Sequence, residues 1–515
     1  MSSPDPLIGS GDELLRPATR RRFLAWVGIA GGALLLPGVF SACGDSDDIT
    51  RPGGGAFRLD LASDAGLLNY LYALEQAEAA FYTAALTSPG WSSLDSGEQE
   101  VFSDLHKHEE IHRALLAHLL GSAAIPPITF RTSTLASMTA SADALLASSR
   151  LLEDTGVSAY DGAGQYLSSA NNLVLARKIA SVEARHAAAI RDMVDQRSGG
   201  AGRFFAGDDI VDSSGLDTTA EPDAVLTAVL ALNLVDTASS PIVLENKPRS
   251  VAVSSGAAIQ DALEFLLTFE IFSNEFYKAV LGRSDSTSQN DSFAPVRALV
   301  VAAPTTAASL DQIQRQEAAH VTALAKLGAT NALGLDASSF DFTGGRGAGD
   351  GPFAAAATDF GALLELAQAV EDVGARAYAG QLGSVLADGA TLEVAMRIHS
   401  VEGRHAARLR RIRRQSGAAA IVRLSGTIRG GGASAAGAVG GEPAPAIATL
   451  DAIYGAGSNT TSSPSEANTT QVGMDVASLA GQFPDADAGS EAFDEPLDRG
   501  DVVAIVQRFI SPAIS

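Results

Sequence analysis

The chain has 515 residues, of which 46% are hydrophobic and 6% aromatic, and its formal net charge is −24 at pH 7. This acidic balance argues against nucleic acid as a partner, because phosphate backbones are bound by positively charged surfaces. Cys43 is the single cysteine. The chain therefore forms no intramolecular disulfide, and it lacks the thiolates that a rubredoxin-type or iron–sulfur centre needs.

The N-terminal segment has the features of an export signal. Residues 19–24, Thr-Arg-Arg-Arg-Phe-Leu, resemble a twin-arginine motif, and a moderately apolar run follows from Ala25 to Phe40. This run contains Gly and Pro and is too short for a membrane span, as is typical of a signal peptide. We therefore expect residues 1–42 to direct export by the twin-arginine route.

The signal ends in a sequence that predicts a lipid anchor. Residues 40–44, Phe-Ser-Ala-Cys-Gly, resemble a bacterial lipobox, although Phe40 replaces the usual aliphatic residue. Lipidation of Cys43 would place the protein in the periplasm or at the cell surface, bound to the membrane through its lipid alone. An uncleaved or differently cleaved signal is the alternative. Residues 43–56 are polar and Gly-rich and predict a flexible tether.

The rest of the chain is predicted to be all-α. Helical periodicity groups the predicted helices into a first bundle at 57–200 and a second at 257–415. A linker at 201–256, with a helical piece near 223–234, joins the bundles, and an irregular tail follows at 416–515. Long connections between the second and third helices of each half fit the crossover of a four-helix bundle. The predicted helices span 65–88, 97–121, 135–160, 170–197, 257–282, 293–328, 355–380 and 390–415.

Four of these helices carry the motif Glu-x-x-His. Residues three apart lie on one face of a helix, so a carboxylate and an imidazole at this spacing can bind one cation. A single motif of this kind arises often by chance, whereas four are informative. The pairs are Glu109/His112, Glu183/His186, Glu317/His320 and Glu402/His405.

The other four helices each carry a glutamate with a tyrosine seven residues later. These single glutamates alternate with the Glu-x-x-His pairs in the same order in both halves, which identifies the sequence as a tandem duplication. Insertions have accumulated between the elements, while the acidic and imidazole positions recur. The additional pairs are Glu75/Tyr82, Glu153/Tyr160, Glu270/Tyr277 and Glu371/Tyr378.

This order resembles the ferritin-like superfamily, which includes ferritins, rubrerythrins and manganese catalases, and especially its secreted bacterial members. A two-ion site in such a bundle uses one Glu from each of two helices and a Glu-x-x-His from each of the others. The resemblance covers roughly residues 60–200 and 257–415 and implies two tandem ferritin-like four-helix bundles. The tail is similar to that of the secreted members around Phe493–Leu497. The linker segment Gly215–Val229 resembles this part of the tail more weakly.

The resemblance implies two sets of metal ligands, carried over residue by residue. Glu78 and Glu110 compete for ligand roles, but the second copy has Ser273 and Ala318 at the matching positions, which favours Glu75 and Glu109. The first set is Glu75, Glu109, His112, Glu153, Glu183 and His186. The second set is Glu270, Glu317, His320, Glu371, Glu402 and His405.

Several residues near the motifs have two interpretations. The tyrosines return to the ligand face of their helices, where a phenol could hydrogen-bond a ligand carboxylate and assist catalysis, or they are ordinary half-buried residues. Arg185 and Arg404 are charges just outside the ligands or surface residues. Four histidines without a repeat partner are expected in solvent. The tyrosines are Tyr82, Tyr160, Tyr277 and Tyr378; the histidines are His106, His108, His118 and His399.

The expected cofactor is a dinuclear iron or manganese centre in each bundle. Two divalent ions balance four carboxylates, which would otherwise repel one another when buried. Carboxylate-rich ligation with one imidazole per ion suits iron or manganese better than structural zinc.

Three functions fit this cofactor, and the first is a redox enzyme for oxidative defence. It would act on peroxide or dioxygen, as catalase-like and ferroxidase-like proteins do. The second is metal binding or storage, and the third is a non-catalytic stress- or desiccation-related lipoprotein. The presence of all twelve candidate ligands argues against the third. Nothing in the sequence separates iron from manganese, identifies the oxidant or sets the oligomeric state.

Overall fold

The structure is a computed structural model that describes residues 56–249, 256–284, 289–415, 453–454, 464–476, 478 and 488–511. The predicted signal, Cys43 and nearly all of the tether lie outside these residues, as does most of the tail. Within the described ranges, no helix combines the length and apolar character needed to cross a membrane.

The first bundle is built from four long helices with polar caps. The side chain of the residue before each helix accepts a hydrogen bond from a backbone N–H of the first turn, a group that the helix itself leaves unpaired. The capping residues are Ser63, Asp95, Ser141 and Ser169. The helices are α3 (Asp64–Ala85), α4 (Ser96–Leu120), α6 (Ala142–Gly164) and α7 (Ala170–Arg197).

The second bundle is again built from four long helices, α9 (Ala257–Leu281), α11 (Pro304–Lys326), α12 (Phe360–Val385) and α13 (Gly389–Gln415). Two predicted helices are interrupted. The helix predicted at 293–328 is divided into α10 (Arg297–Ala302) and α11, because Pro304 has no N–H to continue the first helix and instead begins the next. The helix predicted at 135–160 is divided into α5 (Thr132–Met138) and α6 where Ser141 caps a new start.

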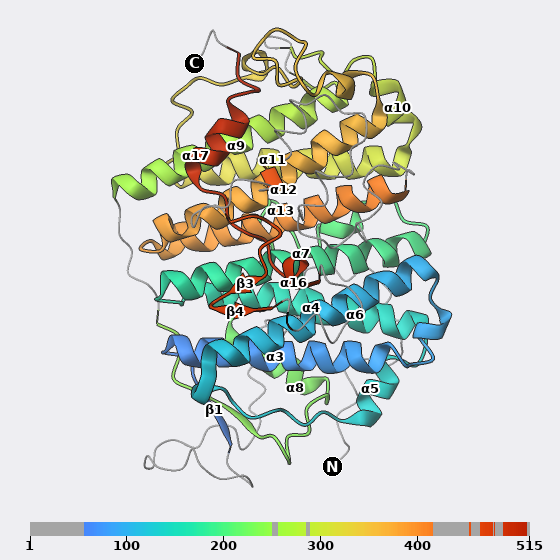
Figure 1. The fold of residues 1–515 in the computed structure, drawn as a ribbon, viewed down its shortest axis with the longest axis vertical. Helices are drawn as coiled ribbons and strands as arrows, with labels where there is room; N and C mark the ends of the chain where they lie inside the picture. The colour runs from blue at the N-terminus through green and yellow to red at the C-terminus, as the bar shows by residue number, and fades with distance from the viewer. Residues whose placement is uncertain are drawn as a thin grey trace.

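The two bundles stack along the long axis of the molecule, with α7 of the first packed against α13 of the second (Figure 1). The helices approach closely at Gly403, where a Cβ atom would lie 2.8 Å from the carbonyl oxygen of Ser181. The largest apolar cluster of the described residues extends through both bundles and includes Leu71, Ile179 and Leu392. The all-α prediction is confirmed.

Short elements connect the bundles to the linker and tail. The parallel pair formed by β1 (Phe57–Asp60) and β2 (Ile242–Glu245) was not predicted; it joins the linker to the residues that precede the first bundle. The linker also contains α8 (Pro222–Ala231), close to the predicted helical piece. The described tail contains β3 (Thr470–Gln471), β4 (Met474–Asp475), α16 (Ala488–Glu491) and α17 (Arg499–Val506).

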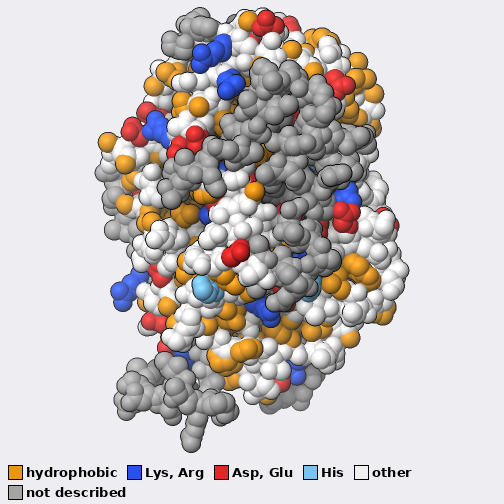
Figure 2. All heavy atoms as spheres, in the orientation of Figure 1, with side chains coloured by type: hydrophobic (Ala, Val, Ile, Leu, Met, Phe, Trp, Pro, Cys, Tyr) orange, Lys and Arg blue, Asp and Glu red, His pale blue; other side chains and the backbone are white. Residues whose placement is uncertain are grey.

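The charged side chains form a surface set and a buried set. On the face shown in Figure 2, acidic and basic side chains are interspersed among apolar ones. The twelve predicted ligands belong to the buried set, and each is 0% exposed. Because burying an ion is costly unless it is paired, these groups identify where a cation or a specific ion pair is needed.

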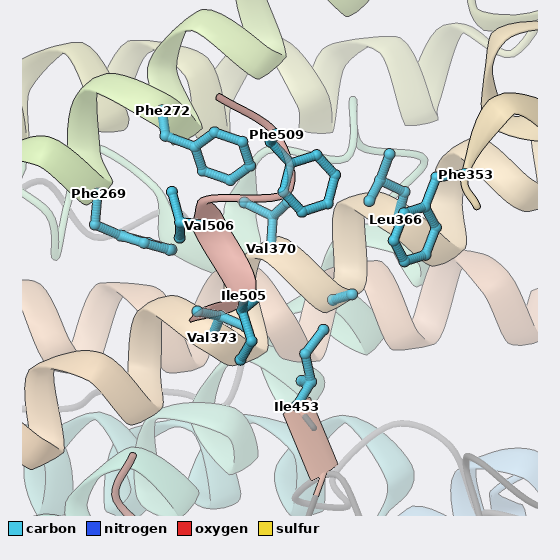
Figure 3. Close-up of a pocket in the computed structure, with 11 residues that line it drawn as sticks. Phe269, Phe272, Phe353, Leu366, Val370, Val373, Ile453, Ile505, Val506 and Phe509 are labelled. Atoms are coloured by element: carbon cyan, nitrogen blue, oxygen red, sulfur yellow. The ribbon is translucent and has the colours of Figure 1, made fainter. Parts of the chain in front are cut away.

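The tail crosses both bundles, from α16 beside α4 to α17 beside α9 and α12 (Figure 1). Around α17, aromatic and aliphatic side chains enclose a small apolar pocket, with Phe269 and Phe272 from α9 facing Val506 and Phe509 from the tail (Figure 3). The tail therefore contributes to the core of the second bundle.

Candidate metal centres

The first bundle brings its six predicted ligands together in two overlapping groups. Glu75 of α3 and His112 of α4 form one group, and Glu153 of α6 and His186 of α7 form the other. Both groups share two further carboxylates, Glu109 and Glu183, and within each group the ligand atoms lie within 4.8 Å of one another. Two adjacent cation positions with two bridging carboxylates are the arrangement of a dinuclear centre.

The distances show how each histidine faces these carboxylates. The Nδ1 atom of His112 lies 3.1 Å from Glu183, 3.4 Å from Glu75 and 3.5 Å from Glu109. The Nδ1 atom of His186 lies 2.9 Å from the other oxygen of Glu109 and 3.4 Å from Glu153. The two oxygens of Glu109 thus face different positions, as a bridging carboxylate must.

The second bundle reproduces this geometry. Its groups pair Glu270 with His320 and Glu371 with His405, and the shared carboxylates are Glu317 and Glu402. The two ligand histidines have ring centroids 6.2 Å apart and an interplanar angle of 26° in each bundle. The duplication has therefore preserved the spatial relationship of the ligands as well as their order.

Many of the atoms that would bind cations have no hydrogen-bond partner in the part of the chain that the structure describes, although Nδ1 of His320 lies 3.3 Å from Glu270 and Nδ1 of His405 lies 3.0 Å from Glu371. In the first bundle, eight buried ligand atoms have no hydrogen-bond partner among the described residues, including both oxygens of Glu109 and Glu183 and the Nδ1 atoms of both histidines. In the second bundle, both oxygens of Glu317 and both oxygens of Glu402 also lack a hydrogen-bond partner among the described residues. Because such groups are costly to bury without a partner, the residues present fit a pair of cations.

Comparison with known proteins agrees with this geometry. The ferritin-like domain family matches residues 63–196 and again 259–415, together more than half of the chain. The chain belongs to the ferritin-like domain family. It is a tandem ferritin-like protein, since each match coincides with one bundle. Neither the curated proteins nor the solved structures include a match to it.

In both ferritin-like bundles the predicted tyrosines bind ligand carboxylates across the site. The hydroxyl of Tyr277 donates a hydrogen bond to Glu371 at 2.5 Å, and that of Tyr378 donates to Glu270 at 2.6 Å. In the first bundle the corresponding bonds run from Tyr82 to Glu153 and from Tyr160 to Glu75. Each tyrosine thus orients the non-bridging glutamate of the opposite helix, and all four are fully buried rather than half-buried.

Backbone carbonyl oxygens of the linker and the tail accept hydrogen bonds from two candidate ligand histidines, at the outer ring nitrogen Nε2, which faces away from the carboxylates. The Nε2 atom of His320 lies 2.8 Å from the carbonyl oxygen of Gly215 in the linker. The Nε2 atom of His112 lies 2.7 Å from the carbonyl oxygen of Ala492 in the tail. Such a bond keeps one proton on Nε2, so that Nδ1 is the nitrogen that can give up its proton to bind a cation. The segment after each bundle therefore supports the site of the other bundle.

Arg185 and Arg404 are buried, so the surface interpretation of these residues is wrong. Arg404 donates to Asp217 of the linker at 2.6 Å, and Arg185 donates to Asp494 of the tail at 2.8 Å. Arg185 also reaches Asp372 in the other bundle at 3.1 Å. These ion pairs fix the linker and tail beside the sites.

Asp217 and Asp494 were missed as individual residues in the sequence. The sequence signal that could have found them was the similarity between the linker and the tail. Aligning the two segments places Asp217 opposite Asp494. Their partners could not be identified before the fold was known.

The prediction that the four unmatched histidines lie in solvent is wrong for His108 and His399, which are 0% exposed. The Nδ1 atom of His108 lies 2.9 Å from Nε2 of His186, and Nε2 of His399 lies 3.2 Å from the carbonyl oxygen of Arg177. A hydrogen-bond partner supplied by another helix, which periodicity does not show, makes their burial possible. His106 is half-buried and His118 is exposed.

The rival glutamates lie outside the groups of candidate ligands. Glu110 is half-buried and pairs with Arg113. Glu78 is buried, and it approaches the site beside Gly156, where a Cβ atom would lie 2.9 Å from Glu78 and 3.1 Å from Glu183. Glycine at this position leaves room for both carboxylates, so Glu78 lies next to the bridging ligand without joining either group.

Burial and mutual repulsion alter the ionisation of the ligands. Burial, followed by the charges of the other carboxylates, raises the pKa of Glu183 and Glu402 well above the usual value. Burial opposes protonation of the histidines and lowers the pKa of His405, but at two others the facing carboxylates outweigh it and raise the pKa of His186 to about 10 and of His320 to about 9. Without a cation, the sites therefore retain protons.

We expect the metal-free protein to become less stable as pH rises from 6.5 to 9. Groups with a raised pKa keep a proton in the folded chain that the unfolded chain has already released in this window. The free energy of unfolding should fall by about 1.4 kcal/mol per pH unit for each such proton. Urea denaturation with and without Mn²⁺ measures this effect, and bound ions should reduce the slope because they displace the protons. A metal-free profile that rises with pH would contradict the expectation.

Proposed function

We propose that each bundle holds two iron or manganese ions and that these centres react with peroxide or dioxygen in oxidative defence. The observation that carries the proposal is the set of buried ligand atoms left unpaired around two adjacent positions in each bundle. Each position offers one imidazole and three carboxylates, two of them shared. This donor set suits iron or manganese rather than structural zinc.

The protein residues bind and orient the centre. In the first bundle Glu75 and His112 would hold one ion, Glu153 and His186 would hold the other, and two glutamates would bridge them. The tyrosines fix the non-bridging carboxylates from outside. When bound, iron or manganese supplies reversible one-electron changes at each position, chemistry that the side chains lack.

Burial of the ligands supports a small oxidant as the substrate. All twelve are 0% exposed, and backbone from the tail or linker covers one histidine of each site. A large substrate would need both bundle and tail to rearrange, whereas peroxide and dioxygen are small enough to enter through fluctuations of the packing.

Elemental analysis of the natively expressed protein, followed by two assays, tests the proposal. We expect about four ions per chain, two in each bundle. Protein loaded separately with iron and with manganese is then assayed for peroxide disproportionation and for oxidation of ferrous iron by dioxygen. Trace metal in protein folded with both ions present would favour the non-catalytic stress-related alternative. A loaded protein inactive in both assays would leave metal binding and remove the redox role.

A further inference from the structure

The two sites differ in the residue that supports an otherwise equivalent histidine. His186 and His405 occupy matching positions in the repeat, and each directs Nδ1 toward the candidate metal position. The outer Nε2 atom of His405 lies 2.8 Å from the side-chain oxygen of Gln316. The outer Nε2 atom of His186 instead lies 2.9 Å from Nδ1 of His108. His108 and Gln316 are themselves equivalent, since each precedes a bridging glutamate in the sequence.

The second site shows which atom donates in this contact. The side-chain nitrogen of Gln316 donates to the carbonyl oxygen of Ala206 at 2.8 Å, which fixes the amide so that its oxygen faces His405. His405 therefore donates its Nε2–H to an amide oxygen. With that proton on Nε2, Nδ1, which lies 3.0 Å from a carboxylate oxygen of Glu371, is the nitrogen left to bind a cation on the side of the carboxylates.

The same logic applies to the first site, with a different acceptor. If Nδ1 of His186 binds a cation, its remaining proton is on Nε2, and Nδ1 of His108 must accept it. The proton of His108 is then on its own Nε2, which faces Glu491 of α16 at 3.8 Å. A doubly protonated His108 would place two N–H donors against each other at 2.9 Å. The two rings are nearly parallel, with an interplanar angle of 15°, and both are fully buried.

We propose that His108 is a positioning residue that gives the ions of the first site a lower reduction potential than those of the second. This inference rests on the proposed function, because it concerns the ions that the sites would hold. A neutral imidazole nitrogen is a much more basic acceptor than an amide oxygen, so it draws the Nε2 proton further from His186. The more electron-rich His186 is a stronger donor to a cation and favours its trivalent state.

An exchange of the two residues tests the proposal within one chain. Iron-loaded wild-type protein is titrated against redox mediators with electron paramagnetic resonance as the readout. Each two-iron site should take up its electrons over its own range of potential, and the range of the first site should lie below that of the second. His108→Gln should raise the lower range toward the upper one, and Gln316→His should lower the upper range toward the lower one. Equal potentials in the wild type, or an exchange that moves neither potential, would overturn the inference.

Two further measurements separate this role from a structural one. Iron content and thermal stability should remain close to wild type in both variants, since each keeps a hydrogen-bond acceptor, whereas a packing role would change these quantities without moving a potential. If His108→Gln fails to fold, the reverse exchange at Gln316 still gives the shift or excludes it. Wild-type protein that binds neither iron nor manganese would end the proposed function, while iron-loaded protein with equal potentials would end this inference alone.

Discussion

Glu183→Gln is expected to remove both ions from the first site and to leave those of the second, so that metal content falls from about four ions per chain to about two. Glu183 belongs to both ligand groups of its bundle, and an oxygen of its carboxylate lies 3.1 Å from the Nδ1 atom of His112. Glutamine retains the shape but offers one acceptor oxygen and no charge. Two divalent ions would then face three carboxylates in a buried site, which leaves positive charge uncompensated.

The duplicated architecture supplies the matched variant for this experiment. Glu402→Gln should remove the ions of the second bundle, and the double variant should bind only trace metal and show no redox activity. Elemental analysis after dialysis gives the stoichiometry. Glu110→Gln is the control, because Glu110 is on the same helix as a bridging ligand but pairs with Arg113 outside the site. Retention of about four ions by Glu183→Gln would show that Glu183 does not bridge them.

The candidate site was unusually accessible to sequence analysis because its residues follow helical spacing. Glu109 and His112 lie one turn apart, and Tyr82 lies two turns from Glu75, so local periodicity places each group on a defined face. The duplication then supplied an internal comparison that distinguished the repeated glutamates from unmatched ones such as Glu110. Spacing along one helix could not identify the partner of each side chain on another helix. For example, it did not show that Tyr82 donates a hydrogen bond to Glu153.

The irregular segments were much less predictable, for a physical reason. Asp494 interacts with Arg185 across more than three hundred positions of sequence, and nothing local to either residue indicates the contact. His108 was expected in solvent because a histidine without a repeat partner resembles a surface residue; its burial depends on His186 from another helix. Tertiary hydrogen bonds of this kind determine burial without leaving a periodic signal.

The linker and the tail each contact the metal site of the bundle that they do not directly follow, so the two bundles depend on each other. The tail after the second bundle supports His112 of the first site through Ala492, and the linker after the first supports His320 of the second site through Gly215. Arg185 also pairs with Asp372 of the opposite bundle, and Arg404 approaches Asp154 at 3.4 Å. A separated bundle would therefore lack part of the surroundings of its own site.

Asp494→Ala is accordingly expected to weaken the first site although it changes no ligand. The carboxylate of Asp494 accepts from the buried Arg185, so its removal leaves that guanidinium with one ion-pair partner among the described residues, Asp372, and should cost about 3 kcal/mol of unfolding free energy. It also loosens the tail where Ala492 holds His112. Loss of such a support typically weakens metal binding about 10- to 100-fold. Urea denaturation measures the first effect and competition with a chelator the second.

Whether metal affinity falls at one site or at both decides whether the tail supports a metal site or only stabilises the fold. Asp217→Ala removes the equivalent partner of Arg404 and should weaken the second site instead, because the linker holds His320. Asp501→Ala, in α17 of the same tail, is the control and should change stability by less than about 1 kcal/mol. If Asp494→Ala and Asp217→Ala weakened both sites equally, the arginines would stabilise the shared core between the bundles. If Asp494→Ala lowers metal affinity at the first site alone and Asp217→Ala at the second site alone, the tail supports His112 and the linker supports His320.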